Sequence, residues 1–412
     1  MRNHIITGLD LGTSHIRIAV GQRDEENNGK LQIIGLTEFP SQGITKGSIN
    51  SIDDTVSSIT AALEQIEKTT GLPVDQVFLG ISGPYISSQQ GKGVVAVSKV
   101  NGEIEETDVK RAIEAAHTTA SPPNYEMLHV IPKSFIVDGQ SSIKDPIGMT
   151  GIRLEAETLI IHGSSSQIKN FTKCVYRTGL NIEDLVYSAL AVAEAVVNNK
   201  QKDLGVAIID IGAATTHLTV FEGGDLIHSA VLPIGSDHIT SDIALGLRIE
   251  LDTAEKIKLG EGYAVSSEID KKQEINLKNY GEQDDTFISK KYLTKIIEAR
   301  VEEILEKVNG ELTRIDKAGM LPAGIVLTGG GSKLRGIVEQ TKRQLRLPVR
   351  LGQIEKVYSV LDKATDLSFC TAVGLVLWGS QDTDSQTHKG FDIRAVKDIL
   401  KKIQKWIKNL KP

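Results

Sequence analysis

The sequence is poor in the features that mark secreted, membrane-spanning and metal-binding proteins. Its only two cysteines, Cys174 and Cys370, give no disulfide framework and no metal-ligand spacing, so we interpret both as buried, reduced thiols. No apolar run reaches the ~18 residues that a membrane-spanning helix needs, and the first residues lack the apolar core of a signal peptide. The nine histidines have no metal-binding spacing, and no Ser/His/Asp or Cys/His catalytic set is found. These absences favour a cytosolic protein.

An excess of basic charge is also missing from most of the chain. The 412 residues carry a formal net charge of −6, but residues 391–412 hold seven Lys and Arg against two Asp. That segment therefore carries a net charge of +5, and the first 390 residues carry a net charge of −11. An acidic body with a basic tail is not the charge distribution of a nucleic-acid-binding protein. The length itself exceeds one hydrophobic core and predicts two or more domains.

The same short pattern occurs twice in the chain. Residues 5–14 (IITGLDLGTS) and residues 206–216 (VAIIDIGAATT) are each an apolar stretch that ends in Asp, then Gly, then small hydroxyl-bearing residues. An alternating strand follows each of them, so each is predicted to be a hairpin whose tip presents N–H groups and hydroxyls to a phosphate. Asp10 and Asp210 would face a metal-bound water. Two such tips from two halves of the chain predict a clamp around a nucleotide.

A third glycine-rich turn lies at residues 324–332 (GIVLTGGGS), and a helical stretch follows it to about Leu345. A strand, glycines and Ser332 as a helix N-cap would let the backbone approach an anionic or planar ligand at a helix N-terminus. Taken alone, such a loop is more often a purely structural turn, and it supports a nucleotide site only together with the two hairpins. The absence of a Gly-Lys-Ser/Thr element excludes a P-loop, and tips that lead into strands argue against a dinucleotide fold.

The remaining periodicity outlines the other elements. Helices are expected at residues 53–69, 107–117, 166–178, 185–198, 239–258 and 290–309. Strands are expected at residues 77–81, 93–97, 129–137 and 157–161. The block 84–162 has strands and a helix of its own, so it is predicted to be an inserted small domain.

The strings DLGTS, DIGAATT and VLTGGGSKL resemble the motifs of the actin/sugar-kinase/chaperone ATPase superfamily. Within it, the chain resembles the bacterial cell-division family FtsA along essentially its whole length. The narrower resemblance rests on long and unusual strings, at residues 80–83 (GISG), 129–132 (HVIP), 135–139 (FIVDG), 144–149 (KDPIGM), 235–240 (GSDHIT) and 242–244 (DIA).

This resemblance implies an α/β, actin-like bilobal fold of duplicated ribonuclease-H-like domains, with an inserted small α+β domain and a C-terminal amphipathic helix. The implied boundaries are residues 1–83 and 163–203 for actin-like domain I, 84–162 for the inserted FtsA-type domain, 204–238 and 322–378 for the core of domain II, 239–321 for its partner-binding helical subdomain, 379–390 for a flexible linker and 391–412 for a membrane-targeting helix.

The resemblance also assigns the nucleotide site. Asp10 and Asp210 would hold Mg²⁺ through waters, since two carboxylates that face a triphosphate would repel it without a cation. Glu255 and Lys258 lie three residues apart on one helix face and match ribose and adenine contacts, although an exposed ion pair explains them as well. The implied phosphate and adenosine contacts are completed by Gly12, Thr13, Ser14, Gly212, Ala213, Thr215, Thr216, Gly330, Gly331 and Ser332.

Two departures from the family pattern bear on turnover. Ala213 and Ala214 follow Gly212 where the family usually shows further glycines, which narrows backbone freedom at the second tip. Ser188 stands where relatives often carry Gln or Glu at the start of a crossing helix. A serine can hold a water but does not position or polarise it as those side chains do. We therefore expect ATP to bind and its hydrolysis to be slow or absent.

The basic tail carries a continuous apolar stripe at helical spacing, flanked by lysines. This pattern predicts an interfacial helix with its apolar face at the acyl boundary and its lysines on anionic lipid. A helix docked on the body or in a partner's groove is the alternative. The predicted membrane-binding residues are Ile399, Leu400, Lys402, Ile403, Lys405, Trp406, Ile407 and Leu410.

Arg300 interrupts the apolar face of the predicted helix 290–309, where an arginine is rare unless it is paired. One interpretation is a snorkelling or internally paired side chain. The other is a residue beside a groove for an acidic and apolar peptide. FtsA-like proteins bind such a peptide, the C-terminal tail of the tubulin-like FtsZ, on this subdomain, and the resemblance implies Arg300 and Glu303 as the contacts.

Residues and resemblance together predict an ATP- and Mg²⁺-binding, actin-like adaptor that forms open head-to-tail filaments. The implied partners are FtsZ, further copies of the chain, an anionic lipid membrane and other division proteins, with no nucleic acid. The implied location is the cytoplasmic face of the cell membrane at the division septum. One alternative is an FtsA-related scaffold of another envelope machine, such as a pilus-assembly adaptor. A small-molecule kinase of the same superfamily is a second alternative, and it would need a catalytic Asp base in the cleft.

Overall fold

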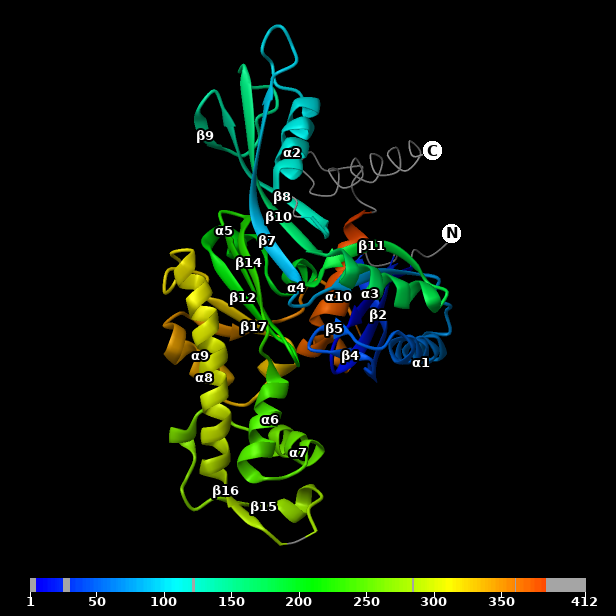
Figure 1. Ribbon diagram of the computed structural model, residues 1–412, viewed down its shortest axis with the longest axis vertical. Coiled ribbons are helices and arrows are strands. Elements are labelled where there is room, and N and C mark those ends of the chain that lie inside the picture. The colour runs from blue at the N-terminus through cyan, green and yellow to red at the C-terminus, as the bar shows by residue number, and fades with distance from the viewer. Residues whose placement is uncertain (1–4, 25–29, 121–122, 284, 360, 383–412) are drawn as a thin grey trace.

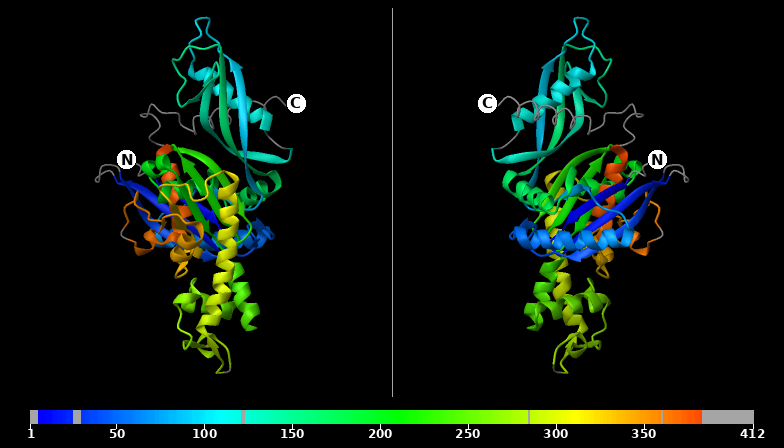
Figure 2. Two further views of the ribbon diagram at one scale, coloured as in Figure 1. Left: turned by 90° about the vertical axis from the view of Figure 1, so that its left-hand side faces the viewer. Right: turned by 90° about the vertical axis from the view of Figure 1, so that its right-hand side faces the viewer.

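The computed structural model describes residues 5–24, 30–120, 123–283, 285–359 and 361–382. Two lobes lie side by side in the middle of an elongated molecule (Figure 1). A small domain projects from one end, and a helical subdomain extends from the other end (Figure 2).

The first lobe contains the strands β1 (Ile5–Leu11), β2 (His15–Asp24), β3 (Lys30–Pro40), β4 (Ile44–Thr45), β5 (Ser48–Ile49), β6 (Gln76–Ile81) and β11 (Asn181–Tyr187), and the helices α1 (Ile52–Thr70), α3 (Ser165–Arg177), α4 (Ser188–Val196) and α10 (Cys370–Asp382). Its main sheet has the order β11-β6-β1-β2-β3. Strands β1 to β3 form an antiparallel meander, and β6 and β11 continue it in parallel. Both Asp10 and the following turn therefore lie at the carboxyl end of the central strand.

The second lobe contains α5 (Asn199–Leu204), β12 (Val206–Ile211), β13 (Thr216–Glu222), β14 (Asp225–Leu232), β17 (Ile325–Thr328), α9 (Ile337–Leu345) and β18 (Val349–Leu351). Its sheet has the order β14-β13-β12-β17-β18. An antiparallel meander again leads into two parallel strands, so the topology of the first lobe is repeated. This repeat is the structural counterpart of the two similar runs in the sequence, and it confirms the predicted duplicated α/β lobes.

The inserted domain contains β7 (Ile86–Ala96), α2 (Glu106–Ala120), β8 (Tyr125–Val137), β9 (Gln140–Ile143) and β10 (Arg153–Ser164), and its antiparallel sheet has the order β7-β10-β8-β9. Helix α2 packs directly on β7. The two backbones are so close that a side-chain carbon added at Gly93 would lie only 1.9 Å from the carbonyl oxygen of Ala112. The domain has a hydrophobic core of its own, which includes Val109, Phe135 and Leu154. The predicted inserted α+β domain is thus present.

The helical subdomain contains α6 (Ser236–Leu247), α7 (Leu251–Glu261), β15 (Glu274–Asn276), β16 (Phe287–Ser289) and α8 (Lys290–Arg314). Short 3-10 turns are η1 (Ser266–Glu268), η2 (Leu277–Tyr280), η3 (Gly330–Lys333), η4 (Asp362–Thr365) and η5 (Leu367–Phe369). Helix α8 contacts both α6 and α9 and so joins the subdomain to the second lobe (Figure 1). Its buried stripe includes Leu293, Ile297, Val301, Ile304 and Val308.

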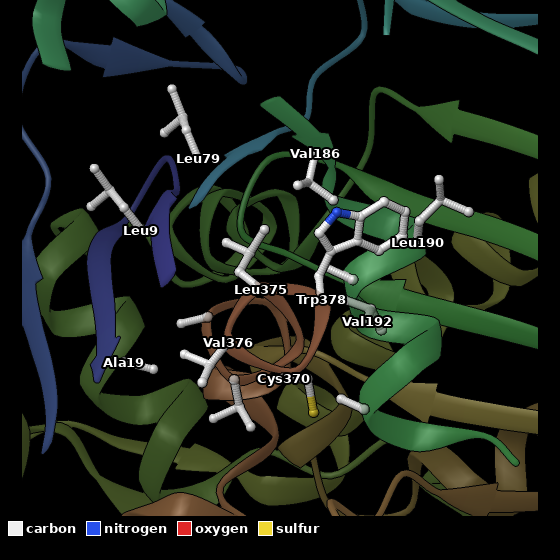
Figure 3. Packing of buried hydrophobic residues seen from close by; sticks show 14 of the residues in the cluster. Leu9, Ala19, Leu79, Val186, Leu190, Val192, Cys370, Leu375, Val376 and Trp378 are labelled. Atoms are coloured by element: carbon white, nitrogen blue, oxygen red, sulfur yellow. The ribbon is translucent and has the colours of Figure 1, made fainter. Parts of the chain in front are cut away.

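Helix α10 lies in the core of the first lobe, between β1 and α4. A side-chain carbon at Gly8 would lie 2.3 Å from the carbonyl oxygen of Ala372, and one at Gly374 would lie 2.0 Å from that of Ala191. Small residues at these contacts allow the close backbone approach. Figure 3 shows Trp378 of this helix between Val186 and Leu190. The helix therefore ties the C-terminal end of the described chain to the N-terminal lobe.

Three predicted boundaries are wrong. Residues 185–187 belong to β11, and the helix begins only at Ser188. The single helix expected at 239–258 is two helices, because the chain turns at Arg248, whose φ of 58° is left-handed. Helix α10 continues to Asp382, with Ser380 buried, so the first four residues of the expected linker 379–390 are helical. The rest of that linker lies outside the described residues. Among the helices of the described ranges, none is both long and apolar enough to cross a lipid bilayer.

Candidate functional site

The two hairpin tips meet between the lobes, as the sequence predicts. They line one cavity of about 80 Å³, together with the start of the third glycine loop. Both tips close in the same way: the N–H of Gly12 donates to the carbonyl of His15 (3.1 Å), and that of Gly212 donates to the carbonyl of Thr215 (2.9 Å). The predicted site residues that line this cavity are Asp10, Gly12, Thr13, Ser14, Asp210, Gly212, Ala213, Thr215 and Gly330.

Three predicted residues of this set do not line the cavity and have contacts within the protein. Thr216 is buried and its hydroxyl donates to the carbonyl of Ile234 (2.8 Å). Gly331 packs against Ile211, where a side-chain carbon would lie 2.4 Å from a methyl group. Ser332 is buried within η3 and its hydroxyl donates to the carbonyl of Gly329 (2.7 Å). The expectation that Ser332 caps the following helix is wrong, since Gly336 precedes α9.

Glu255 and Lys258 lie on α7 and form an ion pair with 2.6 Å between Lys258 Nζ and Glu255 Oε2. Lys258 is buried and also donates to the hydroxyl of Thr240 (2.8 Å). Neither side chain lines the cavity between the tips. Burial and the Arg17 guanidinium lower the pKa of His15, which directly follows the first tip, and the negative charge of Glu255 is among those that oppose this shift, so Glu255 lies near that tip.

The two tip carboxylates are held in an unfavourable electrostatic state. Burial raises the pKa of Asp10 to about 6, against the opposing effect of the Arg17 guanidinium. Burial and the nearby charge of Asp10 raise the pKa of Asp210 to about 7. A divalent cation between the two carboxylates would relieve both effects. Within the described part of the chain, no cluster of three or more His, Cys, Asp or Glu side chains could hold a metal alone. The donor set therefore fits a magnesium ion held partly by waters and a triphosphate.

Sequence reasoning missed two further residues that reach the cavity. Arg17 pairs with Asp10 across β1 and β2, and His217 pairs with Asp210 across β12 and β13. Both follow their aspartate by seven positions, so the duplication itself could have located them. Arg17 supplies a positive charge beside the first tip, with its Cζ 5.8 Å from the centre of the Phe369 ring. Burial lowers the pKa of His217 to about 4, so its imidazole is neutral at pH 7.

Other missed residues come from chain segments without an obvious motif. Gly47, Ser82, Ser368 and Thr371 all line the cavity. Ser368 lies in η5 and Thr371 in the first turn of α10, far along the chain from either tip. The nearby ion pair of Lys333 Nζ with Asp366 Oδ2 (2.8 Å) joins the third glycine loop to this segment. Only the tertiary structure brings these hydroxyls to the site.

The second tip keeps its turn despite the two alanines. Ser236 N–H donates to the carbonyl of Gly212 (2.9 Å) and Asp237 N–H donates to that of Ala213 (2.8 Å). These bonds place the N-terminus of α6 against the tip. Ser188, the residue expected to replace a water-positioning Gln or Glu, is the first residue of α4 and lines the cavity.

Arg300 is internally paired. Its Nε lies 2.5 Å from Asp242 Oδ2 and its Nη2 lies 2.9 Å from Asp242 Oδ1, while Nη1 bonds Glu303. This bidentate bridge joins α8 to α6, and about a quarter of each side chain in the Arg300–Asp242 pair is exposed. The sequence did not reveal Asp242 as the partner. The predicted membrane-binding residues, from Ile399 to Leu410, lie outside the described residues.

Comparison with known proteins decides the family. The family profile described as "Cell division protein FtsA" matches residues 207–374, and that described as "SHS2 domain inserted in FTSA" matches residues 83–162. The cell division protein FtsA of Bacillus subtilis (strain 168) is 38% identical over 400 residues, which cover 96% of this chain and 89% of that protein. That of Pseudomonas aeruginosa is 33% identical over 409 residues, covering 98% and 97%. The chain belongs to the FtsA family of cell-division proteins.

Solved structures show that this FtsA family member has the actin-like fold. The PilM-PilN type IV pilus biogenesis complex aligns with a TM-score of 0.67 at 16% identity, over 91% of this chain and 98% of that chain. MreB5 of Spiroplasma citri bound to ADP aligns with a TM-score of 0.56 at 15% identity, over 93% and 98%. At such identities the likeness concerns the fold alone. The predicted actin-like architecture and its FtsA-type insert are both confirmed.

Proposed function

We propose that the chain binds Mg²⁺-ATP between its lobes. The observation that carries this proposal is the convergence of the two tip aspartates, two glycine tips and the third glycine loop on one cavity. Tip N–H groups and hydroxyls would hold the phosphates, Asp10 and Asp210 would hold the magnesium ion through waters, and Glu255 and Lys258 would face the adenosine. The cavity of about 80 Å³ is below the ~300–1,000 Å³ typical of small-molecule pockets, so we propose that the lobes separate when the nucleotide enters.

We further propose that the chain is an adaptor that tethers the FtsZ division ring to the cytoplasmic membrane at the septum. Its membership of the FtsA family supports this role. The apolar and lysine-rich tail would bind anionic lipid, and the subdomain that carries Arg300 and Glu303 would bind the FtsZ C-terminal peptide. The bound nucleotide would hold the lobes closed in a form that assembles head to tail, and filaments would strengthen membrane binding through multivalency.

An FtsA-related scaffold of another envelope machine is the second candidate. The fold likeness to the pilus PilM-PilN complex is the observation that favours it, but a fold does not determine a function. The 38% identity to an FtsA over nearly the whole chain favours the division adaptor.

A coupled assay with sugars addresses the kinase alternative, and robust phosphorylation of a sugar would contradict the adaptor function.

Electron microscopy of the full chain on lipid monolayers tests the proposal most directly. Filaments are expected on anionic monolayers with Mg²⁺-ATP, and they should recruit FtsZ polymers. The chain truncated before residue 383 is the matched control and should leave the monolayer bare. Absence of both filaments and FtsZ recruitment with the full chain would contradict the adaptor function.

A further inference from the structure

A second cavity, of about 280 Å³, lies where the inserted domain meets both lobes. Strand β8 of the inserted domain, helices α4 and α10 of the first lobe, and α5, β13 and β14 of the second lobe contribute side chains to it (Figure 1). None of the described residues that line it also lines the nucleotide cavity. Its volume approaches the ~300 Å³ at which small-molecule pockets begin, so it has room for a ligand of its own.

The inner wall of this second cavity is apolar. Figure 3 shows two of its side chains, Trp378 and Leu190, beside one another. The only polar atom of the Trp378 side chain, Nε1, bonds to Asp184 (3.3 Å), which does not line the cavity, so the indole offers the cavity carbon atoms alone. A hydrocarbon group fits such a surface. The buried side chains of the wall are Ile131, Phe135, Leu190, Phe221, Leu226 and Trp378.

Charged side chains line the outer part of the cavity. They are three lysines, Lys133, Lys144 and Lys202, against two carboxylates, Glu194 and Asp225, so the lining carries a net charge of +1. All five are more exposed than any side chain of the apolar wall, and the side chain of Lys144 is 60% exposed. The cavity is therefore apolar inside and cationic toward solvent.

Four of these five charges compensate one another. Lys202 Nζ donates to Glu194 Oε1 (2.7 Å), and Lys144 forms an ion pair with Asp225. Burial would raise the pKa of Glu194, but the charges of Lys202 and Lys356 lower it to about 2, so its carboxylate stays ionised and matched by a cation. These four side chains alone would leave the cavity neutral.

Lys133 is the remaining cation. It lies on β8, it is half-buried, and among the described residues it takes part in no ion pair. A partly desolvated ammonium group without a counter-charge is stabilised when an anion binds beside it. Its place next to the apolar wall selects an anion that also carries hydrocarbon.

We propose that this cavity binds an amphipathic anion, with a hydrocarbon chain against the apolar wall and a carboxylate or phosphate head on Lys133. A fatty acid and an anionic phospholipid share this chemistry. The chain's own tail has the opposite charge, since residues 391–412 hold seven Lys and Arg against two Asp. A ligand in this position touches the inserted domain and both lobes, so its binding stabilises their arrangement.

The position of the cavity along the chain favours a lipid-derived ligand. Trp378 lies four residues before the end of α10 at Asp382, which is ~6 Å along a helix. Gln381 Nε2, in the last turn, donates to Glu194 Oε2 (3.1 Å). The tail that we propose as the membrane anchor follows directly, so acyl chains would be close to the cavity. The site itself depends neither on that anchor nor on the nucleotide.

Calorimetry of the full chain with monomeric decanoate tests the site, with Trp406→Glu present throughout so that the tail does not contribute. Saturable binding of one decanoate per chain is expected, and acetate, which lacks the hydrocarbon chain, should show no saturable binding. Lys133→Gln should weaken decanoate binding at least about fivefold and leave binding of uncharged decanol within about twofold. Lys110→Gln removes a lysine from α2 of the same domain, outside the cavity, and should change neither affinity.

Monomeric dihexanoylphosphatidylglycerol distinguishes the two sources of the ligand. Tighter binding of this phospholipid than of decanoate would assign the site to membrane lipid, and the reverse order would assign it to a free fatty acid. Absence of saturable decanoate binding would overturn the proposal, as would equal effects of Lys133→Gln and Lys110→Gln. Because no nucleotide is present, these outcomes leave the proposed nucleotide site untouched.

Discussion

His217 stands opposite Asp210 on the neighbouring strand, in the register position that Arg17 holds opposite Asp10 in the other lobe. The duplicated sheets therefore present two carboxylates and two different nitrogen side chains to one cavity. The first pair contains a permanent cation. The second pair contains an imidazole that is neutral at pH 7 because burial lowers its pKa. The two lobes therefore place side chains of different charge at equivalent positions beside the cavity.

Asp210→Ala should abolish the magnesium-dependent part of ATP binding, because one of the two carboxylates facing the ion is lost. We expect affinity for Mg²⁺-ATP to fall at least about tenfold by calorimetry, which corresponds to ~1.4 kcal/mol. Asp203→Ala, which removes an exposed carboxylate from α5 of the same lobe, should leave affinity unchanged. Retained Mg²⁺-ATP affinity in Asp210→Ala would refute the clamp.

The stability of the nucleotide-free chain should depend on pH through the same carboxylates. Their folded-state pKa values of about 6 and about 7 lie above the ordinary value of 3.8, so between these limits the folded chain binds more protons than the unfolded chain. Their contribution to the free energy of unfolding therefore falls as pH rises from about 4 to 7. Asp210→Asn removes one of the two titrating carboxylates. It should therefore raise the free energy of unfolding by on the order of 3 kcal/mol at pH 8.

Urea unfolding of both proteins at pH 5 and pH 8, without nucleotide or Mg²⁺, measures this difference. The variant should gain stability relative to the wild type at pH 8 and much less at pH 5. If the free energy of unfolding of the wild type changes between pH 5 and pH 8 in the same way as that of the variant, the two carboxylates are not buried together.

Trp406→Glu should prevent the chain from binding lipid. The substitution puts a charge in the centre of the predicted apolar stripe, where insertion into the interface would have to bury it. Co-sedimentation with anionic vesicles should be lost. Gln404→Glu changes the net charge equally on the predicted polar face and should reduce binding only slightly. Equal behaviour of the two variants would refute the interfacial helix.

Arg300→Ala should weaken binding of the FtsZ C-terminal peptide about tenfold, as expected when a charged contact is lost. Asp242→Ala removes the bidentate partner but leaves the guanidinium free for peptide carboxylates, so it should preserve or strengthen binding. The bridge, of which about a quarter of each side chain is exposed, should itself contribute no more than about 1 kcal/mol to stability. Fluorescence anisotropy with a labelled peptide measures both variants, and equal losses would assign Arg300 a purely structural role.

Gly374→Ala should destabilise the first lobe by on the order of 3 kcal/mol, because the new methyl group would lie 2.0 Å from the carbonyl oxygen of Ala191 and would push α10 away from α4. Gly310→Ala on α8 meets nothing within 4 Å and should stabilise its helix by roughly 0.5–1 kcal/mol. Opposite shifts of the thermal midpoints are therefore expected. A Gly374→Ala variant as stable as the wild type would contradict the close packing of α10.

The sequence predicts those parts of the fold that depend on local patterns. The two Asp-Gly hairpins, helix 53–69 and the inserted block follow from periodicity and turn residues, and all three are present. The errors lie where local pattern is ambiguous. Residues 185–187 are as compatible with a helix as with β11, and the turn at Arg248 interrupts a stretch whose apolar spacing continues across it.

The sequence by itself determined the family, the duplicated lobes and the aspartates at their tips, because each of these features corresponds to a short contiguous sequence motif. Tertiary structure decided which of the predicted residues share a cavity. It turned Thr216 and Ser332 inward to backbone carbonyls, paired Arg300 with Asp242, and placed Ser188 and His217 on facing lobes. Such relationships join residues from separate elements, and only the packing of the two sheets and of α10 fixes them. The physical reason is that buried polar atoms must find partners in three dimensions, and a linear pattern does not specify which ones.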